Sequence, residues 1–180
     1  ELVESGCDGI TTNCGFLALT QARISEAVPV PVATSSLMQI PMVQALLPPG
    51  KKVAVLTISK ASLTTNHLRA AGVQNPENVP IFGTDGGRAF TRCILDDHES
   101  IDFAECRLDM IDAAKEIVET DRDIGAIVLE CTNMTPYAHD VRKVTGLPVF
   151  SIYSFVKWFH QGLVPDRFRL ELDDPRAGLF

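Results

Sequence analysis

Short apolar runs alternate along the chain with longer segments that carry apolar residues at helical spacing. The runs predict strands, and the amphipathic segments between them predict helices. The predicted strands are residues 9–12, 31–34, 53–58, 79–82, 126–130 and 149–152. The predicted helices are residues 16–27, 38–47, 63–71, 103–119, 136–145 and 155–161. Continuously apolar strands joined by helices are typical of a parallel sheet that is covered on both faces.

The chain also contains an internal repeat. Residues 7–15 align with residues 124–132 at an offset of 124 − 7 = 117. At the same offset, a Pro-Val pair at residues 31–32 falls on a second Pro-Val pair at residues 148–149. Each copy has the predicted order strand, loop, helix, strand, helix. Repeated units of this kind indicate two related lobes that pack around a shared region.

The repeat predicts an α/β fold of two pseudo-symmetric parallel-sheet lobes of Rossmann-like type. The strand at residues 53–58 would have its counterpart near 53 − 117 = −64, so we expect the first lobe to be incomplete by about one βαβ unit. We expect the remainder of the first lobe to occupy residues 1–50 and the second lobe residues 51–165. Residues 166–180 are expected to form a C-terminal tail, poorly ordered from residue 173 onward.

Composition excludes several classes of partner. The formal net charge of −7, with no basic run, argues against nucleic-acid binding, which depends on clustered positive charge. No apolar stretch approaches the roughly 20 residues needed to cross a bilayer, so no membrane partner is expected. The 5 cysteines cannot all pair and lack zinc-site spacing. We therefore expect reduced thiols, a cytoplasmic location and no metal.

Cys14 and Cys131 occupy matching places in the two copies, each directly after a predicted strand and before a predicted helix. Ligands of parallel α/β sheets bind beyond the carboxyl ends of the strands. A helix N-terminus lowers the pKa of a thiol, so both cysteines are expected to have thiolate character. The other cysteines, which have no symmetry mates, are interpreted as structural: Cys7, Cys93 and Cys106.

Two thiols that face one cleft from opposite sides suit the inversion of a carbon acid. One thiolate removes a proton from one face while the other thiol delivers a proton to the opposite face. Backbone N–H groups around Gly15 and Thr132, with the side-chain amides of Asn13 and Asn133, are expected to hold the developing enolate or the substrate carboxylate. This chemistry requires no cofactor.

The motifs Thr-Thr-Asn-Cys-Gly at residues 11–15 and Leu-Glu-Cys-Thr-Asn at residues 129–133 resemble the aspartate/glutamate racemase superfamily. This superfamily also includes hydantoin racemases, maleate cis-trans isomerases and arylmalonate decarboxylases. Its members that invert a centre keep both cysteines, as this chain does. The chain departs from the amino-acid racemases in placing Asn13 before Cys14, where they place Asn after the first cysteine.

The resemblance further implies substrate contacts from the loops that follow the strands at residues 53–58 and 79–82. Ser59 and Thr84 are the candidate binding residues in these loops. Together, the motifs predict a cofactor-independent racemase or epimerase of a small carboxylate-bearing substrate, for example an aspartate-like or glutamate-like amino acid or a derivative. The alternatives are a hydantoin racemase, a maleate-type isomerase with a covalent thiol adduct, a thiol redox protein, and a non-catalytic small-molecule sensor. Homo-oligomer formation is left open.

Overall fold

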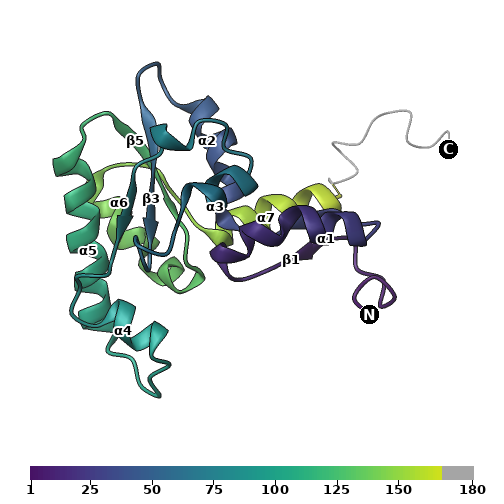
Figure 1. Ribbon diagram of the computed structural model, residues 1–180, viewed down its shortest axis with the longest axis horizontal. Coiled ribbons are helices and arrows are strands. Elements are labelled where there is room, and N and C mark those ends of the chain that lie inside the picture. The colour runs from purple at the N-terminus through teal and green to yellow at the C-terminus, as the bar shows by residue number, and fades with distance from the viewer. Residues whose placement is uncertain (168–180) are drawn as a thin grey trace.

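The structure is a computed structural model that describes residues 1–167 (Figure 1). The expected disorder from residue 173 onward lies outside the described residues. The strands are β1 (Ile10–Thr11), β2 (Val32–Ala33), β3 (Lys52–Thr57), β4 (Ile81–Gly83), β5 (Ile124–Leu129) and β6 (Val149–Phe150). The α-helices are α1 (Gln21–Ala27), α2 (Ile40–Leu46), α3 (Thr65–Ala70), α4 (Phe90–Leu95), α5 (Phe103–Thr120), α6 (Ala138–Thr145) and α7 (Ile152–Leu163). The 3-10 helices are η1 (Gly15–Thr20), η2 (Ser36–Gln39), η3 (Pro76–Asn78) and η4 (Thr132–Tyr137).

The strands form two parallel sheets, which confirms the predicted α/β fold. The four-stranded sheet has the order β4-β3-β5-β6, and β1 pairs with β2 in a two-stranded sheet. Ala54 and Leu56 of β3 pack with α5 and α6, whereas Val53 and Val55 pack with α2 and α3. Figure 1 shows these helix pairs on opposite sides of β3. Both faces of the strand are therefore buried, which explains its uninterrupted apolar sequence.

The backbone reproduces the offset of 117 found in the sequence. Ile10 pairs with Val32 in the first half, and Ile127 pairs with Val149 in the second. The 3-10 helices η1 and η4 also begin and end 117 residues apart. The two halves are thus matched residue by residue, from the first strand through the helix that follows it.

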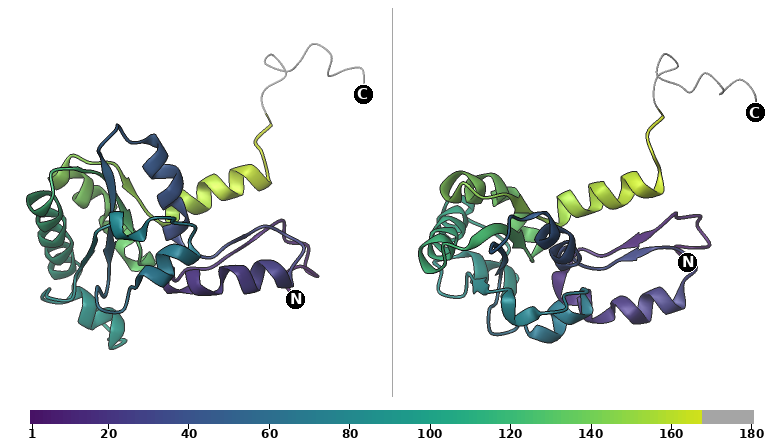
Figure 2. Two further views of the ribbon diagram at one scale, coloured as in Figure 1. Left: turned by 45° about the horizontal axis from the view of Figure 1, so that its top comes forward. Right: turned by 90° about the horizontal axis from the view of Figure 1, so that it is seen from above.

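Helices exchanged between the halves hold them together. Helix α2 follows β2 of the first half but buries Ile40 and Val43 in the core beneath β3 and β5. Helix α7 follows β6 of the second half but packs beside β1, where Phe159 and Leu163 lie against Gly9. The right-hand view of Figure 2 shows the β1–β2 pair between α1 and α7.

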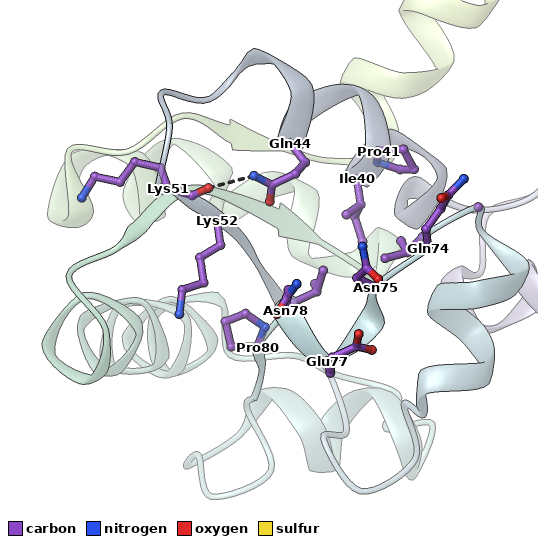
Figure 3. Close-up of a pocket in the computed structure, with 14 residues that line it drawn as sticks. Ile40, Pro41, Gln44, Lys51, Lys52, Gln74, Asn75, Glu77, Asn78 and Pro80 are labelled. Carbon is purple, nitrogen blue, oxygen red and sulfur yellow. Dashed lines mark hydrogen bonds between the residues drawn. The ribbon is translucent and has the colours of Figure 1, made fainter.

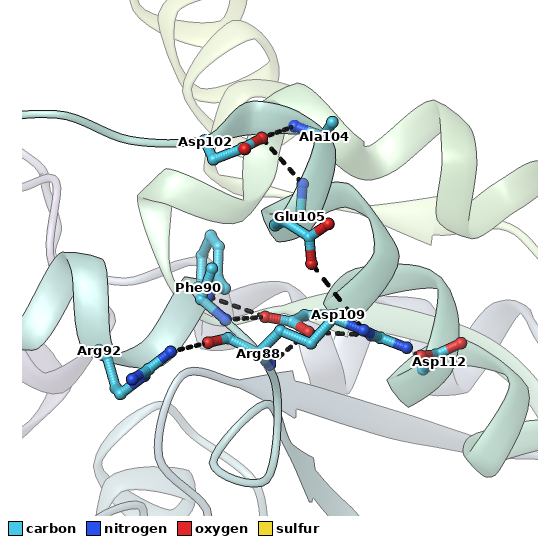
Figure 4. Close-up of polar contacts among 9 residues, drawn as sticks. Arg88, Phe90, Arg92, Asp102, Ala104, Glu105, Asp109 and Asp112 are labelled. Atoms are coloured by element: carbon cyan, nitrogen blue, oxygen red, sulfur yellow. Dashed lines mark hydrogen bonds and ion pairs between the residues drawn. The ribbon is translucent and has the colours of Figure 1, made fainter.

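Helix α4 was not predicted from the sequence, and a carboxylate distant in sequence holds its first residues. Asp109 of α5 accepts hydrogen bonds from the backbone N–H groups of Arg88, Ala89 and Phe90 at 2.6–2.8 Å (Figure 4). Burial would raise the pKa of Asp109, but these donors and the Arg88 guanidinium lower it below its usual value. Asp109 thus supplies the cap that the local sequence before α4 lacks.

Candidate active site

The two cysteine loops meet at the carboxyl ends of their strands. Cys14 caps η1 and is exposed, whereas Cys131 caps η4 and is half-buried. The Thr132 hydroxyl donates a hydrogen bond to the backbone carbonyl of Asn13. Asn13, the residue before Cys14, therefore contacts Thr132, the residue after Cys131, although the two are 119 positions apart in sequence.

A second contact between the halves lies directly behind these loops. The Ser36 hydroxyl, at the start of η2, donates to the carbonyls of Leu129 and Glu130 at 2.7 and 3.1 Å. Both carbonyls lie at the end of β5, just before Cys131. Ser36 is itself buried, so this contact fixes the first half against the end of the strand that carries the second cysteine.

A carboxyl group that the sequence analysis did not select lies at the same place. Glu130 is 1% exposed, and its Oε2 accepts a 2.7 Å hydrogen bond from the Thr57 hydroxyl at the end of β3. The carboxyl also accepts from the backbone N–H of Ile58. Its other side lies against Gly15, where a Cβ atom would stand 2.7 Å from the carboxyl carbon. The sequence did carry a signal for this residue, because Glu130 is an acidic residue directly after an apolar strand that is expected to be buried.

The expectation that Cys131 has a lowered pKa is wrong. Burial and the charge of Glu130 raise the pKa of the Cys131 thiol to about 12, and proximity to Cys14 also raises it. The backbone N–H groups of Asn133 and Met134 act in the opposite direction but do not compensate. Cys131 is therefore a protonated thiol at neutral pH.

The remaining predicted binding residues occupy different surroundings. Asn13 and Asn133 are exposed beside the two cysteines. Ser59 is linked to Glu130 through Thr57. Its backbone N–H donates to the Thr57 hydroxyl at 3.4 Å, and this hydroxyl donates to Glu130. Thr84 pairs with the Thr91 hydroxyl at 3.0 Å and lines a cavity of about 430 Å³ that neither cysteine lines.

That cavity also contains Arg88, the cation nearest in sequence to Thr84. Arg88 forms ion pairs with Asp109 and Asp112 at 3.2 and 2.7 Å and lies 4.0 Å from Glu105 (Figure 4). Its charge is thus already matched by carboxylates of α5. The structure accounts for Arg88 as a support for α4 and α5 rather than as a receptor for a substrate carboxylate.

A cavity of about 760 Å³ opens at the opposite end of the sheet (Figure 3). It is lined by Ile40, Gln44, Lys52, Asn78 and Pro80, among others, close to the start of β3. None of its lining residues belongs to the cysteine loops. Size alone therefore does not identify the site in this fold, where ligands bind at the carboxyl ends of the strands.

Within residues 1–167, no helix is long and apolar enough to cross a membrane. In the same range, no group of three or more His, Cys, Asp and Glu side chains is placed to hold a metal ion.

Comparison with known sequences identifies related proteins. The sequence profile described as Asp/Glu/Hydantoin racemase matches residues 1–154. A dimethylsulfoniopropionate lyase of Durusdinium sp. clade D is 29% identical over 180 residues, covering 98% of this chain and 56% of the relative. Dimethylsulfoniopropionate lyase 3 of Emiliania huxleyi is 31% identical over 156 residues, covering 83% of this chain and 40% of the relative. The chain thus spans about half the length of these curated relatives.

Solved structures share the fold at lower sequence identity. A glutamate racemase of Bacillus anthracis superposes with a TM-score of 0.58 at 16% identity, covering 92% of this chain and 63% of that one. An allantoin racemase of Pseudomonas fluorescens superposes with a TM-score of 0.57 at 20% identity, covering 87% of this chain and 62% of that one. An arylmalonate decarboxylase superposes with a TM-score of 0.56 at 19% identity, covering 94% of this chain and 75% of that one. These likenesses establish the fold.

Proposed function

Because the chain belongs to the Asp/Glu/Hydantoin racemase family, we propose that the protein uses Cys14 and Cys131 to move a proton at a carbon next to a carboxylate. The observation that carries this proposal is the hydrogen bond from Thr132 to Asn13, which joins the two cysteine loops. Removing a proton from such a carbon requires a base positioned within reach of it, and a thiolate can act as that base. The proposed reaction uses no cofactor.

The same loops offer donors for the negative charge that develops on the substrate. The first N–H groups of η1 and η4 have no partner within their own helices, and both helices begin directly after a cysteine. N–H groups of this kind stabilise an enolate or carboxylate because they are already oriented before the reaction begins. The exposed amides of Asn13 and Asn133 are the proposed side-chain donors.

We favour elimination as the outcome of proton removal, because the sequence relatives at 29% and 31% identity are named dimethylsulfoniopropionate lyases. A thiolate would take the proton from the carbon next to the carboxylate. The electron pair of that bond would form a carbon–carbon double bond as the carbon–sulfur bond breaks, giving acrylate and dimethyl sulfide. The leaving sulfide is neutral and needs no proton, so a single base suffices. The unequal surroundings of the two thiols fit this requirement.

Inversion is the second candidate, and the matched positions of Cys14 and Cys131 favour it. In a cofactor-independent racemase or epimerase of an amino acid or derivative, each thiol would serve one face of the carbon. Cys131, whose raised pKa keeps its proton in place at neutral pH, would act first as the acid. The substrate would be a small carboxylate-bearing molecule in either case.

Product analysis of the natural protein tests both candidates. Incubation with dimethylsulfoniopropionate is expected to release dimethyl sulfide, measured in the headspace by gas chromatography. Parallel incubations of aspartate and glutamate in deuterated water detect exchange by NMR and inversion by chiral chromatography. The Cys14→Ala/Cys131→Ala double variant is the control and is expected to be inactive in every assay. Activity of this variant at the wild-type rate would contradict the proposal, and binding without exchange or product would favour the sensor alternative.

A further inference from the structure

The two halves differ in charge at the residue directly before each cysteine. At the offset of 117, Asn13 corresponds to Glu130. Asn13 is exposed and neutral, whereas Glu130 is buried and ionisable. Burying an ionisable carboxyl group is unfavourable unless it is compensated, and such a group beside a thiol in a candidate site is a candidate functional residue.

Contacts from three parts of the chain hold Glu130 in place. Thr57 donates to its Oε2 at 2.7 Å from the end of β3, and the N–H of Ile58 donates to the same carboxyl. Gly15, next to Cys14, leaves no room for a side chain between η1 and the carboxyl. Ser36 fixes the backbone of Glu130 by donating to its carbonyl. Glu130 therefore contacts the loop of the first cysteine while its backbone leads into the second.

We propose that Glu130 is the positioning residue of the thiol site, whose fixed carboxyl group keeps the proton on Cys131. This inference rests on the proposed function, since it concerns the proton that the reaction moves. A carboxylate next to a thiol disfavours a second negative charge there. Glu130 thereby adds beside Cys131 a negative charge that has no counterpart beside Cys14, where Asn13 occupies the matching position.

Other titratable groups act on this site in smaller ways. The Cys14 thiol disfavours ionisation of Cys131 from the first half, after burial and Glu130. His67 of α3 approaches the loop of Cys14 through the ring of Phe16, with ring centroids 5.2 Å apart. Burial lowers the pKa of His67, so it does not place a cation against the thiols at neutral pH.

Alkylation of individual cysteines in the natural protein tests the inference without requiring turnover. Iodoacetamide reacts with thiolates, and mass spectrometry follows each cysteine separately from pH 7 to pH 10. Glu130→Gln keeps the size of the side chain and removes its charge. We expect Cys131 to be alkylated about tenfold faster in this variant at each pH, the effect of one pKa unit. An unchanged rate at Cys131 would overturn the proposal.

Matched variants separate charge from loosening of the structure. Thr57→Ser removes a buried methyl group but keeps the hydroxyl that donates to Glu130, and Asn13→Gln alters the corresponding residue of the first half. Both are expected to leave the Cys131 rate within about threefold of wild type, a difference below one pKa unit. Cys106 is fully buried and reports opening of the core. Equal acceleration of Cys131 in Thr57→Ser, or acceleration of Cys106 in Glu130→Gln, would assign the effect to loosening and overturn the inference.

Turnover provides an independent readout once a substrate is identified. The part of the pH–rate profile governed by Cys131 is expected to move about one unit to lower pH in Glu130→Gln, whether this thiol acts as acid or base. If no substrate is turned over, the alkylation result still stands and only the proposed function fails. If a substrate is turned over but neither readout moves, only the role of Glu130 fails.

Discussion

The two halves share a backbone but not an environment. The segment from β1 through η1 to β2 matches the segment from β5 through η4 to β6 in strand register and in the position of the cysteine. Cys14 is nevertheless exposed, while Cys131 is half-buried beside a buried carboxyl. Matching backbones can therefore place two identical side chains at equivalent points and still give them different surroundings.

Within residues 1–167, the rest of the four-stranded sheet surrounds the second cysteine more than the first. β5 lies between β3 and β6, so its end is covered by Thr57 and Ile58 and by Ser36. β1 pairs with β2, and among residues 1–167 it has no second strand neighbour. Desolvation acts on the second cysteine because more of the described chain surrounds it.

Single replacement of each cysteine should produce the largest effect and break the symmetry directly. We expect the alanine variant that removes the required base to lose activity by about a thousandfold, within the usual range for a general base. Under elimination, Cys14→Ala and Cys131→Ala should differ strongly from each other in dimethyl sulfide release. Under inversion, both should lose racemisation, and each should retain deuterium exchange of a different enantiomer. Exchange of the same enantiomer by both variants would rule out paired bases.

The sequence predicted the features that depend on local pattern. The repeat, the parallel strands and the matched cysteines follow from apolar runs and from one constant offset, and the structure confirms the α/β fold and the offset. Helix α4 could not be predicted, because its cap comes from Asp109 on another helix. The burial of Glu130 could not be predicted for the same reason, because it depends on Gly15 and Thr57, which are distant in sequence. The division into residues 1–50, 51–165 and 166–180 stays a prediction.

Substitutions at Gly15 and at its counterpart Thr132 should have intermediate effects on stability and activity. Gly15→Ala would force a methyl group against the fixed carboxyl of Glu130, and overpacking of this kind costs about 1–3 kcal/mol. We expect a reduction of about tenfold or more in kcat/KM, since a small displacement of a catalytic loop has effects of that size or larger. Thr132→Val replaces only the hydroxyl that donates to Asn13, by a methyl group, and should cost about 1 kcal/mol. Urea unfolding and steady-state kinetics measure both. Equal stability of Gly15→Ala and wild type would contradict the packing seen here.

Stability as a function of pH should show the smallest effect. Burial raises the pKa of Glu130 above its ordinary value of 4.5, although Thr57 and Ile58 partly oppose this. A carboxyl group with a raised folded-state pKa binds more protons in the folded chain, so the protein loses stability as the pH rises from 4.5 through that pKa. Glu130→Gln does not titrate. Its stability relative to wild type should therefore increase with pH, by about 1.4 kcal/mol for each unit of pKa difference. Asn13→Asp, which adds a carboxylate at the exposed matching position, should show no comparable dependence. Urea unfolding at pH 4.5 and pH 8 measures both variants, and a Glu130→Gln advantage that shrinks toward pH 8 would show that burial does not control this carboxyl.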